Sequence, residues 1–163
     1  MKSLKQSQTK YSRQAGFSLI EIMVVIGLIS VIGLISFSIS IGGFQRSTLN
    51  SERDLLVTIL QTARSKSLIN SNEVAHGVYI EADTIILFED TDKDGHFTDG
   101  TDVEITFPAN TGVTHGGDSE FLFAQLSGDE ITTGEDIVLT GTRTSDSVTV
   151  SVYDNGRIDW IWN

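Results

Sequence analysis

The longest apolar stretch of the chain runs from Phe17 to Ile41, and Glu21 is its only charged residue. A helix of these 25 residues would be about 37 Å long, which exceeds the roughly 30 Å hydrocarbon core of a membrane. Residues 1–16 carry four lysines or arginines and no acid. Because positive flanks stay in the cytoplasm, the pattern predicts a single-pass helix with a cytoplasmic N-terminus and an exported remainder.

Between residues 42 and 70 the apolar positions recur at spacings of three and four, with charges elsewhere. This spacing predicts an amphipathic helix whose apolar face packs on the domain that follows. The predicted stripe is Leu49, Glu52, Leu55, Leu56, Ile59, Leu60, Ala63 and Ser67, and the cations beside it are Arg46, Arg53, Arg64 and Lys66. We expect these cations mainly to be solvated, the alternative being that they face acidic surfaces on neighbouring molecules.

Residues 71–163 contain short runs of β-branched and apolar residues separated by turn residues. Asn155-Gly156 is typical of a hairpin turn, and Val148, Val150 and Val152 alternate with polar residues as in a half-buried strand. Seven strands are predicted: Val74–Ile80, Thr84–Glu89, Val103–Phe107, Glu120–Leu126, Asp136–Thr140, Ser147–Tyr153 and Arg157–Trp162.

The predicted fold is α+β, with a long N-terminal hydrophobic helix packed on an antiparallel β-sandwich or bent sheet. One part of this helix is a membrane anchor and the other is amphipathic. The expected organisation is a cytoplasmic leader (1–16), a transmembrane and assembly helix (17–41), an amphipathic helix (42–70) and an exported β-rich domain (71–163).

The amino-acid composition and the charge of the chain exclude several classes of function. The chain has no cysteine, which excludes disulfides, thiolate catalysis and cysteine zinc sites. Its formal net charge is −11, and from Glu73 to Asn163 there are 19 acids and three bases. Such a surface repels phosphate backbones, so we expect no nucleic-acid contact. His115-Gly116-Gly117 has no nucleophile elbow to accompany it and is interpreted as a glycine-rich connection, so we expect no enzymatic activity.

A short motif opens the apolar stretch: Gly16-Phe17-Ser18-Leu19-Ile20-Glu21. An acid inside an apolar helix is costly and marks a functional site. If the chain were cut between Gly16 and Phe17, the new amine would lie one helical turn from the Glu21 carboxylate. That amine could pair with Glu21 of the same helix or with Glu21 of a neighbouring helix. Plainer interpretations stay open: Glu21 complements the helix dipole of an uncleaved anchor, or the whole segment is a secretory signal cleaved after Gly42.

This motif, followed by a long apolar helix, resembles the class III signal of type IV pilins and type II secretion pseudopilins. The resemblance implies cleavage after Gly16 by prepilin peptidase, N-methylation of Phe17 and a role for Glu21 in docking the subunit into a helical filament. The element order and the terminal hairpin are similar to those of minor pseudopilins (GspH/FimT-like), the hairpin through Asn155-Gly156-Arg157-Ile158.

One acidic segment offers a candidate metal site. Alternate aspartates followed by a glycine begin a calcium loop of the EF-hand type, in which the next carbonyl, here that of His96, is also a ligand. The twelfth position is Thr101, so Asp99 or Asp102 would have to close the site. The alternative is a solvated acidic turn. The candidate calcium ligands are Asp90, Asp92, Asp94, His96, Asp99 and Asp102.

The sequence therefore predicts a structural subunit, a minor pilin or pseudopilin, of a type II secretion pseudopilus or a type IV pilus-like filament. The resemblance implies as partners other pilin or pseudopilin subunits, prepilin peptidase, the inner-membrane assembly platform and, before assembly, the membrane itself. The expected location is the inner membrane, with the C-terminal domain periplasmic or extracellular. The alternative function is a membrane-anchored calcium-dependent binding module.

Overall fold

The computed structural model describes residues 16–117, 120–132 and 136–163, without the side chains of residues 35–43. The predicted leader therefore lies, except for Gly16, outside the described residues. The chain forms two compact units, Met1–Ile39 and Ser40–Asn163. One α-helix, α1 (Leu19–Leu68), contributes residues to both units. Each unit is described separately below.

In the first unit, α1 begins directly after Ser18. The Ser18 carbonyl oxygen accepts hydrogen bonds from the backbone N–H groups of Glu21 (3.0 Å) and Ile22 (3.2 Å). The large apolar side chains from Phe17 to Leu34 are all exposed, with exposed fractions between 45% and 80%. Within the residues that the structure describes, no helix combines the length and the apolarity needed to cross a membrane.

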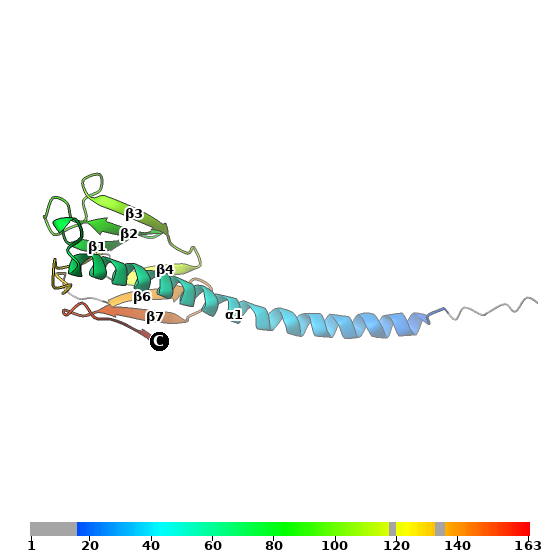
Figure 1. Ribbon diagram of the computed structural model, residues 1–163. Helices are drawn as coiled ribbons and strands as arrows, with labels where there is room; N and C mark the ends of the chain where they lie inside the picture. The colour runs from blue at the N-terminus through cyan, green and yellow to red at the C-terminus, as the bar shows by residue number, and fades with distance from the viewer. Residues whose placement is uncertain (1–15, 118–119, 133–135) are drawn as a thin grey trace, which may run out of the picture. The chain divides into compact units, whose positions relative to one another are not determined.

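The second unit contains two antiparallel four-stranded sheets (Figure 1). The first has the order β3-β2-β1-β5 and the second the order β4-β6-β7-β8. A short 3-10 helix, η1 (Ser71–Glu73), links α1 to the first strand. The strands are β1 (His76–Ile80), β2 (Thr84–Glu89), β3 (Val103–Pro108), β4 (Val113–Gly117), β5 (Glu120–Phe123), β6 (Asp136–Gly141), β7 (Ser147–Val152) and β8 (Ile158–Trp162).

The sequence prediction of seven strands missed β4. This strand is Val-Thr-His-Gly-Gly, and of its residues Val113 alone is a buried apolar one, so no alternating pattern marks it. Its pairing with β6 creates the strand, since strand formation depends strongly on tertiary context. His115-Gly116-Gly117, interpreted as a glycine-rich connection at a strand end, instead forms the last three residues of β4 itself. The predicted strand Glu120–Leu126 also ends early, at Phe123.

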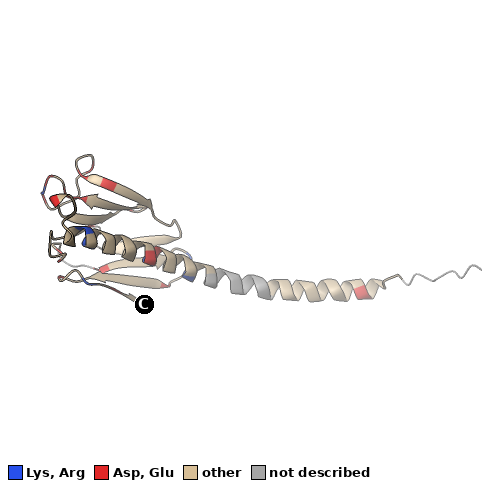
Figure 2. Cartoon of the chain, in the orientation of Figure 1, with Lys and Arg blue, Asp and Glu red and all other residues tan. Residues whose placement is uncertain are grey.

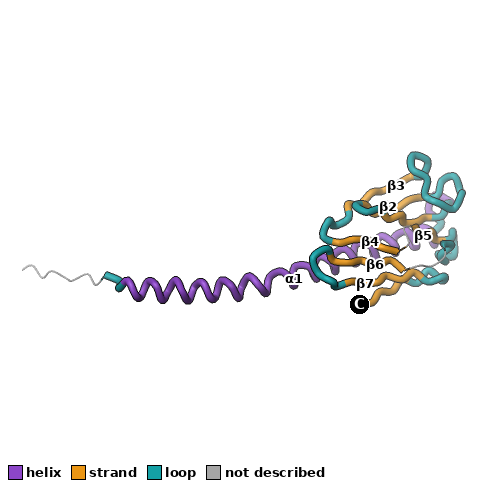
Figure 3. The backbone as a smooth tube through the Cα atoms, turned by 180° about the vertical axis from the view of Figure 1, so that it is seen from behind, coloured by secondary structure: helices purple, strands orange, loops and turns teal. Residues whose placement is uncertain are grey.

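The C-terminal half of α1 lies across both sheets and forms one core with them. Figures 1 and 3, which view the molecule from opposite sides, show the helix on one face of the strands. The predicted stripe is confirmed in its main apolar members, and side chains from both sheets join them in a single cluster. The fully or almost fully buried helix residues in this cluster are Leu49, Leu56, Ile59, Leu60 and Ala63.

Two polar residues of the stripe, Glu52 and Ser67, are also buried and have partners on the sheets. The Glu52 Oε1 atom lies 3.0 Å from Nε2 of His115 on β4, and Oε2 accepts the Asn110 N–H at 3.2 Å. The Ser67 hydroxyl donates to the Phe123 carbonyl and accepts the His76 N–H, both at 2.9 Å. Glu52 thus joins α1 to the second sheet and Ser67 joins it to the first.

The expectation of mainly solvated helix cations is wrong for Arg53, Arg64 and Lys66, which contact the chain's own domain, whereas the Arg46 side chain is 66% exposed. The Arg53 guanidinium lies 3.9 Å from the ring centre of Trp160 on β8, within cation–π range. The Lys66 amine lies 3.0 Å from the Glu89 carboxylate. Arg64 donates to the carbonyls of Gly128 (3.2 Å) and Asn155 (3.1 Å), which lie in two separate loops. These contacts add polar links around the apolar core.

The predicted hairpin at Asn155-Gly156 is confirmed: β7 and β8 pair antiparallel on either side of it. Gly156 has φ +70°, and a Cβ there would lie 1.9 Å from the Gly128 carbonyl oxygen. Only glycine fits, because of the backbone conformation and because of the neighbouring loop.

We predict that Gly156→Ala lowers the free energy of unfolding by about 3 kcal/mol, from left-handed strain together with the clash. Gly100→Ala is the matched control, since Gly100 has φ +73° but nothing near its added Cβ, and should cost about 1 kcal/mol. Denaturant unfolding of the two variants checks this. Equal losses would mean that the approach to Gly128 does not constrain this hairpin.

His76 is fully buried beside Glu89, with Nε2 3.4 Å from Oε1 of the carboxylate. Burial lowers the pKa of His76, and the nearby Lys66 acts in the same direction, against the opposing effect of Glu89. Burial also acts to raise the pKa of Glu89, but hydrogen bonds from Asn72 and Lys66 prevail and lower it. At neutral pH the site therefore holds an uncharged imidazole next to a paired carboxylate.

This arrangement predicts a pH dependence of stability. Folding lowers the pKa of His76. The contribution of His76 to the free energy of unfolding is therefore complete above its pKa in the unfolded chain, about 6.5, and is lost as the pH falls below that value. Thermal unfolding between about pH 7.5 and 5.5 should show a steeper fall in Tm for the wild type than for His76→Gln, whose amide does not titrate. Parallel curves would contradict the buried neutral histidine.

Candidate functional site: an assembly motif and an acidic loop

The N-terminal motif stands at the transition from extended chain to helix. Gly16, Phe17 and Ser18 precede α1, and the Phe17 side chain is 80% exposed. A Cβ added to Gly16 would meet no atom within 4 Å. The peptide bond between Gly16 and Phe17 therefore lies outside the helix, and an added side chain at Gly16 would meet no described neighbour.

Glu21 lies in the first turn of α1 and is the one charged residue between Phe17 and Leu34. The side chains around it are exposed and apolar. A carboxylate in the first turn is favoured by the positive end of the helix dipole. It is also one turn from the place where cleavage would create an amine. The roles of Gly16, Phe17 and Glu21 in cleavage, methylation and docking stay predictions.

The acidic segment forms the loop from Asp90 to Asp102, between β2 and β3. These strands pair with Glu89 opposite Val103, so the two ends of the loop meet. The register thereby places Asp90 next to Asp102, twelve residues further along the chain. One carboxylate oxygen each from Asp90, Asp92 and Asp102 lies within 4.8 Å of the other two.

The other three predicted ligands are not part of this group. The Asp94 carboxylate accepts hydrogen bonds from the His96 N–H (2.9 Å) and the Thr98 hydroxyl (3.4 Å). The His96 ring nitrogen Nδ1 lies 3.5 Å from the Glu120 carboxylate. Asp99 is exposed. Between the two acids considered for closing the site, Asp102 and not Asp99 lies beside Asp90 and Asp92.

Asp90 is 4% exposed although it carries a carboxyl group. Burial raises its pKa, and the neighbouring Asp102 and Asp94 add to this, against the opposing effect of the backbone N–H groups of Gly95 and Lys93. Its Oδ1 atom is buried with no hydrogen-bond partner among the described residues. Asp102 differs in this respect, because its two oxygens accept the N–H groups of Thr91 (2.8 Å) and Thr98 (2.9 Å).

Phe97 anchors this loop, and the sequence interpretation missed it. Its ring stacks on Tyr79 with ring centres 4.9 Å apart and lies 5.3 Å from Phe88. Its N–H donates to the Glu120 carboxylate at 2.6 Å. The loop is thus fastened to the face of the first sheet that points away from the main core. A single aromatic residue within an acidic segment was the available signal.

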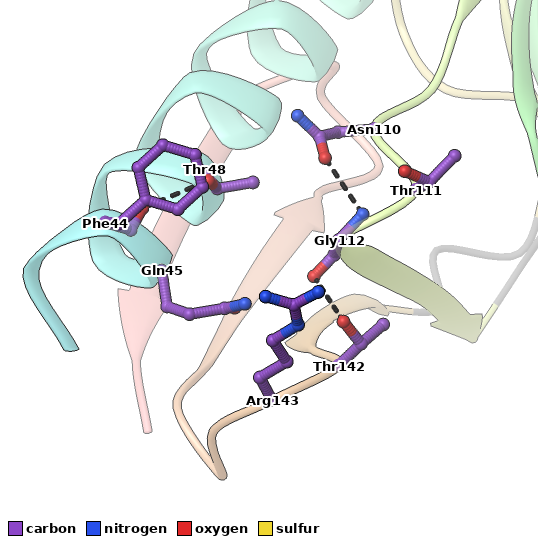
Figure 4. Close-up of a pocket in the computed structure, with 8 residues that line it drawn as sticks. All are labelled: Phe44, Gln45, Thr48, Asn110, Thr111, Gly112, Thr142 and Arg143. Carbon is purple, nitrogen blue, oxygen red and sulfur yellow. Dashed lines mark hydrogen bonds between the residues drawn. The ribbon is translucent and has the colours of Figure 1, made fainter. Parts of the chain in front are cut away.

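A separate shallow hollow of about 310 Å³ is formed where the helix meets two loops (Figure 4). The Asn110 side chain accepts the Gly112 N–H at 2.9 Å, and the Thr142 hydroxyl donates to the Gly112 carbonyl at 3.2 Å. Arg143 is the one ionisable residue that lines it. The hollow offers polar contacts and no arrangement of acid, base and nucleophile.

Two comparisons with known proteins find a match, one for the N-terminal residues and one for the fold. Residues 11–37 match the family model described as the prokaryotic N-terminal methylation motif. Among solved structures, the chain is similar to the minor pseudopilin EpsH from the type 2 secretion system of Vibrio cholerae, with a TM-score of 0.50 and 12% sequence identity. That match covers 69% of this chain and 94% of the other. A comparison with curated proteins finds no match.

At this level of identity the structural likeness shows the fold, whereas the motif shows the N-terminal signal. The motif includes Gly16, Phe17 and Glu21 within its matched range. The α+β fold, with its N-terminal helix on two antiparallel sheets, is the one predicted from the sequence. The chain thus combines a prokaryotic N-terminal methylation motif with a fold similar to that of a minor pseudopilin.

Proposed function

We propose that the chain is a minor subunit of a type II secretion pseudopilus or a related type IV pilus-like filament, processed by prepilin peptidase. The observation that carries this proposal is the position of the motif. An exposed, non-helical Gly16–Phe17 bond is followed at once by a helix with exposed apolar side chains and one acid, Glu21. A pseudopilin-like domain then follows in the same chain.

Processing prepares the helix for assembly. The peptidase hydrolyses the bond between Gly16 and Phe17, which removes the basic leader and creates an α-amine on Phe17. A methyl group is then added to that amine. Loss of the four leader cations also removes the charges that hold the N-terminus at the cytoplasmic face.

Glu21 then aligns neighbouring subunits. In a bundle of apolar helices an unpaired carboxylate is costly, and pairing it with an amine offsets part of that cost. The Phe17 amine of an adjacent subunit supplies that partner when the two helices are packed with the correct axial offset. The pair therefore favours one register over others, while the apolar contacts themselves are tolerant of sliding.

The apolar part of α1 serves first as a membrane anchor and later as filament core. Its exposed side chains are suited to lipid and equally to neighbouring helices, so exchange of one environment for the other costs little. This proposal places the precursor in the inner membrane, with its exported domain in the periplasm and an inner-membrane platform as its assembly partner.

The exported domain would meet its neighbours through an acidic surface. Figure 2 shows Asp and Glu distributed over the strands and loops of this unit. Lys66 pairs with Glu89, but the few cations of the helix and strands are outnumbered by the 19 acids between Glu73 and Asn163. This favours adjacent subunits that present basic residues. The alternative function, a membrane-anchored calcium-dependent binding module, gains no support from the comparisons.

Gly16→Leu should block processing, because a bulky side chain beside the scissile bond obstructs the peptidase while leaving the fold unchanged. The precursor would accumulate in membranes, as seen by immunoblotting and N-terminal sequencing. The matched control is Gly33→Leu, which adds the same side chain at an open position within α1 and should be processed normally. Normal cleavage of Gly16→Leu would contradict the assigned site.

Glu21→Gln should be processed normally but fail to assemble, since its amide lacks the charge that pairs with the Phe17 amine. We expect at least a tenfold smaller fraction of the chain in isolated filaments, which corresponds to a loss of about 1.4 kcal/mol. Glu104→Gln, an exposed acid on β3, is the control and should assemble like the wild type. Normal incorporation of Glu21→Gln would remove the docking role.

A further inference from the structure

We propose that the loop between β2 and β3 binds a calcium ion through the carboxylates of Asp90, Asp92 and Asp102. This site goes beyond the proposed function, because it depends on the exported domain alone and not on processing or assembly. It would therefore be present whichever filament the subunit serves.

The strand register creates the site. Pairing of Glu89 with Val103 brings the first and last residues of a thirteen-residue loop together, so that Asp102 faces Asp90 and Asp92. The loop holds five aspartates and a single lysine. Without a cation these carboxylates repel one another at short range.

The distances match one oxygen-liganded ion. Calcium binds oxygen at about 2.3–2.6 Å, so two ligands on opposite sides of the ion are about 4.6–5.2 Å apart. The three carboxylate oxygens all lie within 4.8 Å of one another, inside that span. Backbone carbonyls of the loop and water would supply the remaining ligands, as is usual for calcium.

A second observation points independently to a ligand. Asp90 is 4% exposed, and its Oδ1 atom is buried without a hydrogen-bond partner among the described residues. A buried carboxylate oxygen of this kind costs free energy unless a donor or a cation meets it. An ion held between Asp90, Asp92 and Asp102 would compensate that oxygen and relieve the repulsion together.

The loop is held in place by contacts that need no metal. Phe97 packs on Tyr79 and Phe88, and Glu120 accepts the Phe97 N–H. Gly95, with φ +84°, makes the sharp turn after Asp94. These contacts keep the ligands close before an ion binds. Binding therefore causes a smaller loss of conformational entropy in the loop.

The chemistry of the ligands selects calcium among common cations. All three are carboxylate oxygens, a hard ligand set that does not suit zinc or copper. Magnesium needs a smaller and more regular octahedral shell at about 2.1 Å. With ligands from a surface loop and water, the expected Kd is on the order of 10–1,000 μM.

The test is calorimetric titration of the full chain, in detergent micelles and free of divalent ions, with calcium chloride. We expect one ion per chain and a rise in Tm on the order of 5 °C at saturation. Asp92→Asn, an exposed position, should weaken binding at least tenfold. Asp90→Asn should abolish the rise, while its Tm without calcium should equal or exceed that of the wild type, because a buried charge is removed.

The matched control is Asp99→Asn, which removes an exposed acid of the same loop that lies outside the cluster and should bind calcium like the wild type. A folded wild-type chain with neither heat nor a Tm shift at about 10 mM calcium would overturn the proposal. So would an equal response to magnesium chloride, or an equal loss in Asp99→Asn and Asp92→Asn, since either would indicate diffuse screening of charge.

Discussion

The fold of the exported unit depends on one packing interaction, the burial of the α1 stripe from Leu49 to Ala63 against two separate sheets. Among the residues that the structure describes, the two sheets share no hydrogen-bonded ladder, and side chains of this helix and of their own inner faces join them. Polar contacts set the register of the packing, with Glu52 bound to the second sheet and Ser67 to the first.

The two parts of α1 present different kinds of side chain to their surroundings. Its first part offers exposed apolar side chains and the single acid Glu21, which suits lipid or neighbouring helices. In its second part the apolar residues pack in the core, and most of the cations contact side chains or carbonyls of the same domain. The strands and loops carry most of the acids of the chain, and the loop from Asp90 to Asp102 holds five of them.

Features that depend on neighbouring residues could be predicted from the sequence. The helix stripe follows from spacing, the last hairpin from Asn155-Gly156, and the N-terminal signal from six consecutive residues. Features that depend on distant pairs could not. Strand β4 exists because it pairs with β6, and Arg53 meets Trp160 from far along the chain. Six candidate calcium ligands could be named, but the register of β2 and β3 decides that Asp102 lies beside Asp90.

The central claim is that this chain is a processed filament subunit and not a permanently tethered domain. The most direct measurement is the intact mass of the wild-type protein recovered from membranes of cells with and without prepilin peptidase. The account predicts a mature chain that begins at Phe17 and carries one additional methyl group, and an uncleaved chain when the peptidase is absent. A chain that still begins at Met1 in the presence of the peptidase would contradict it.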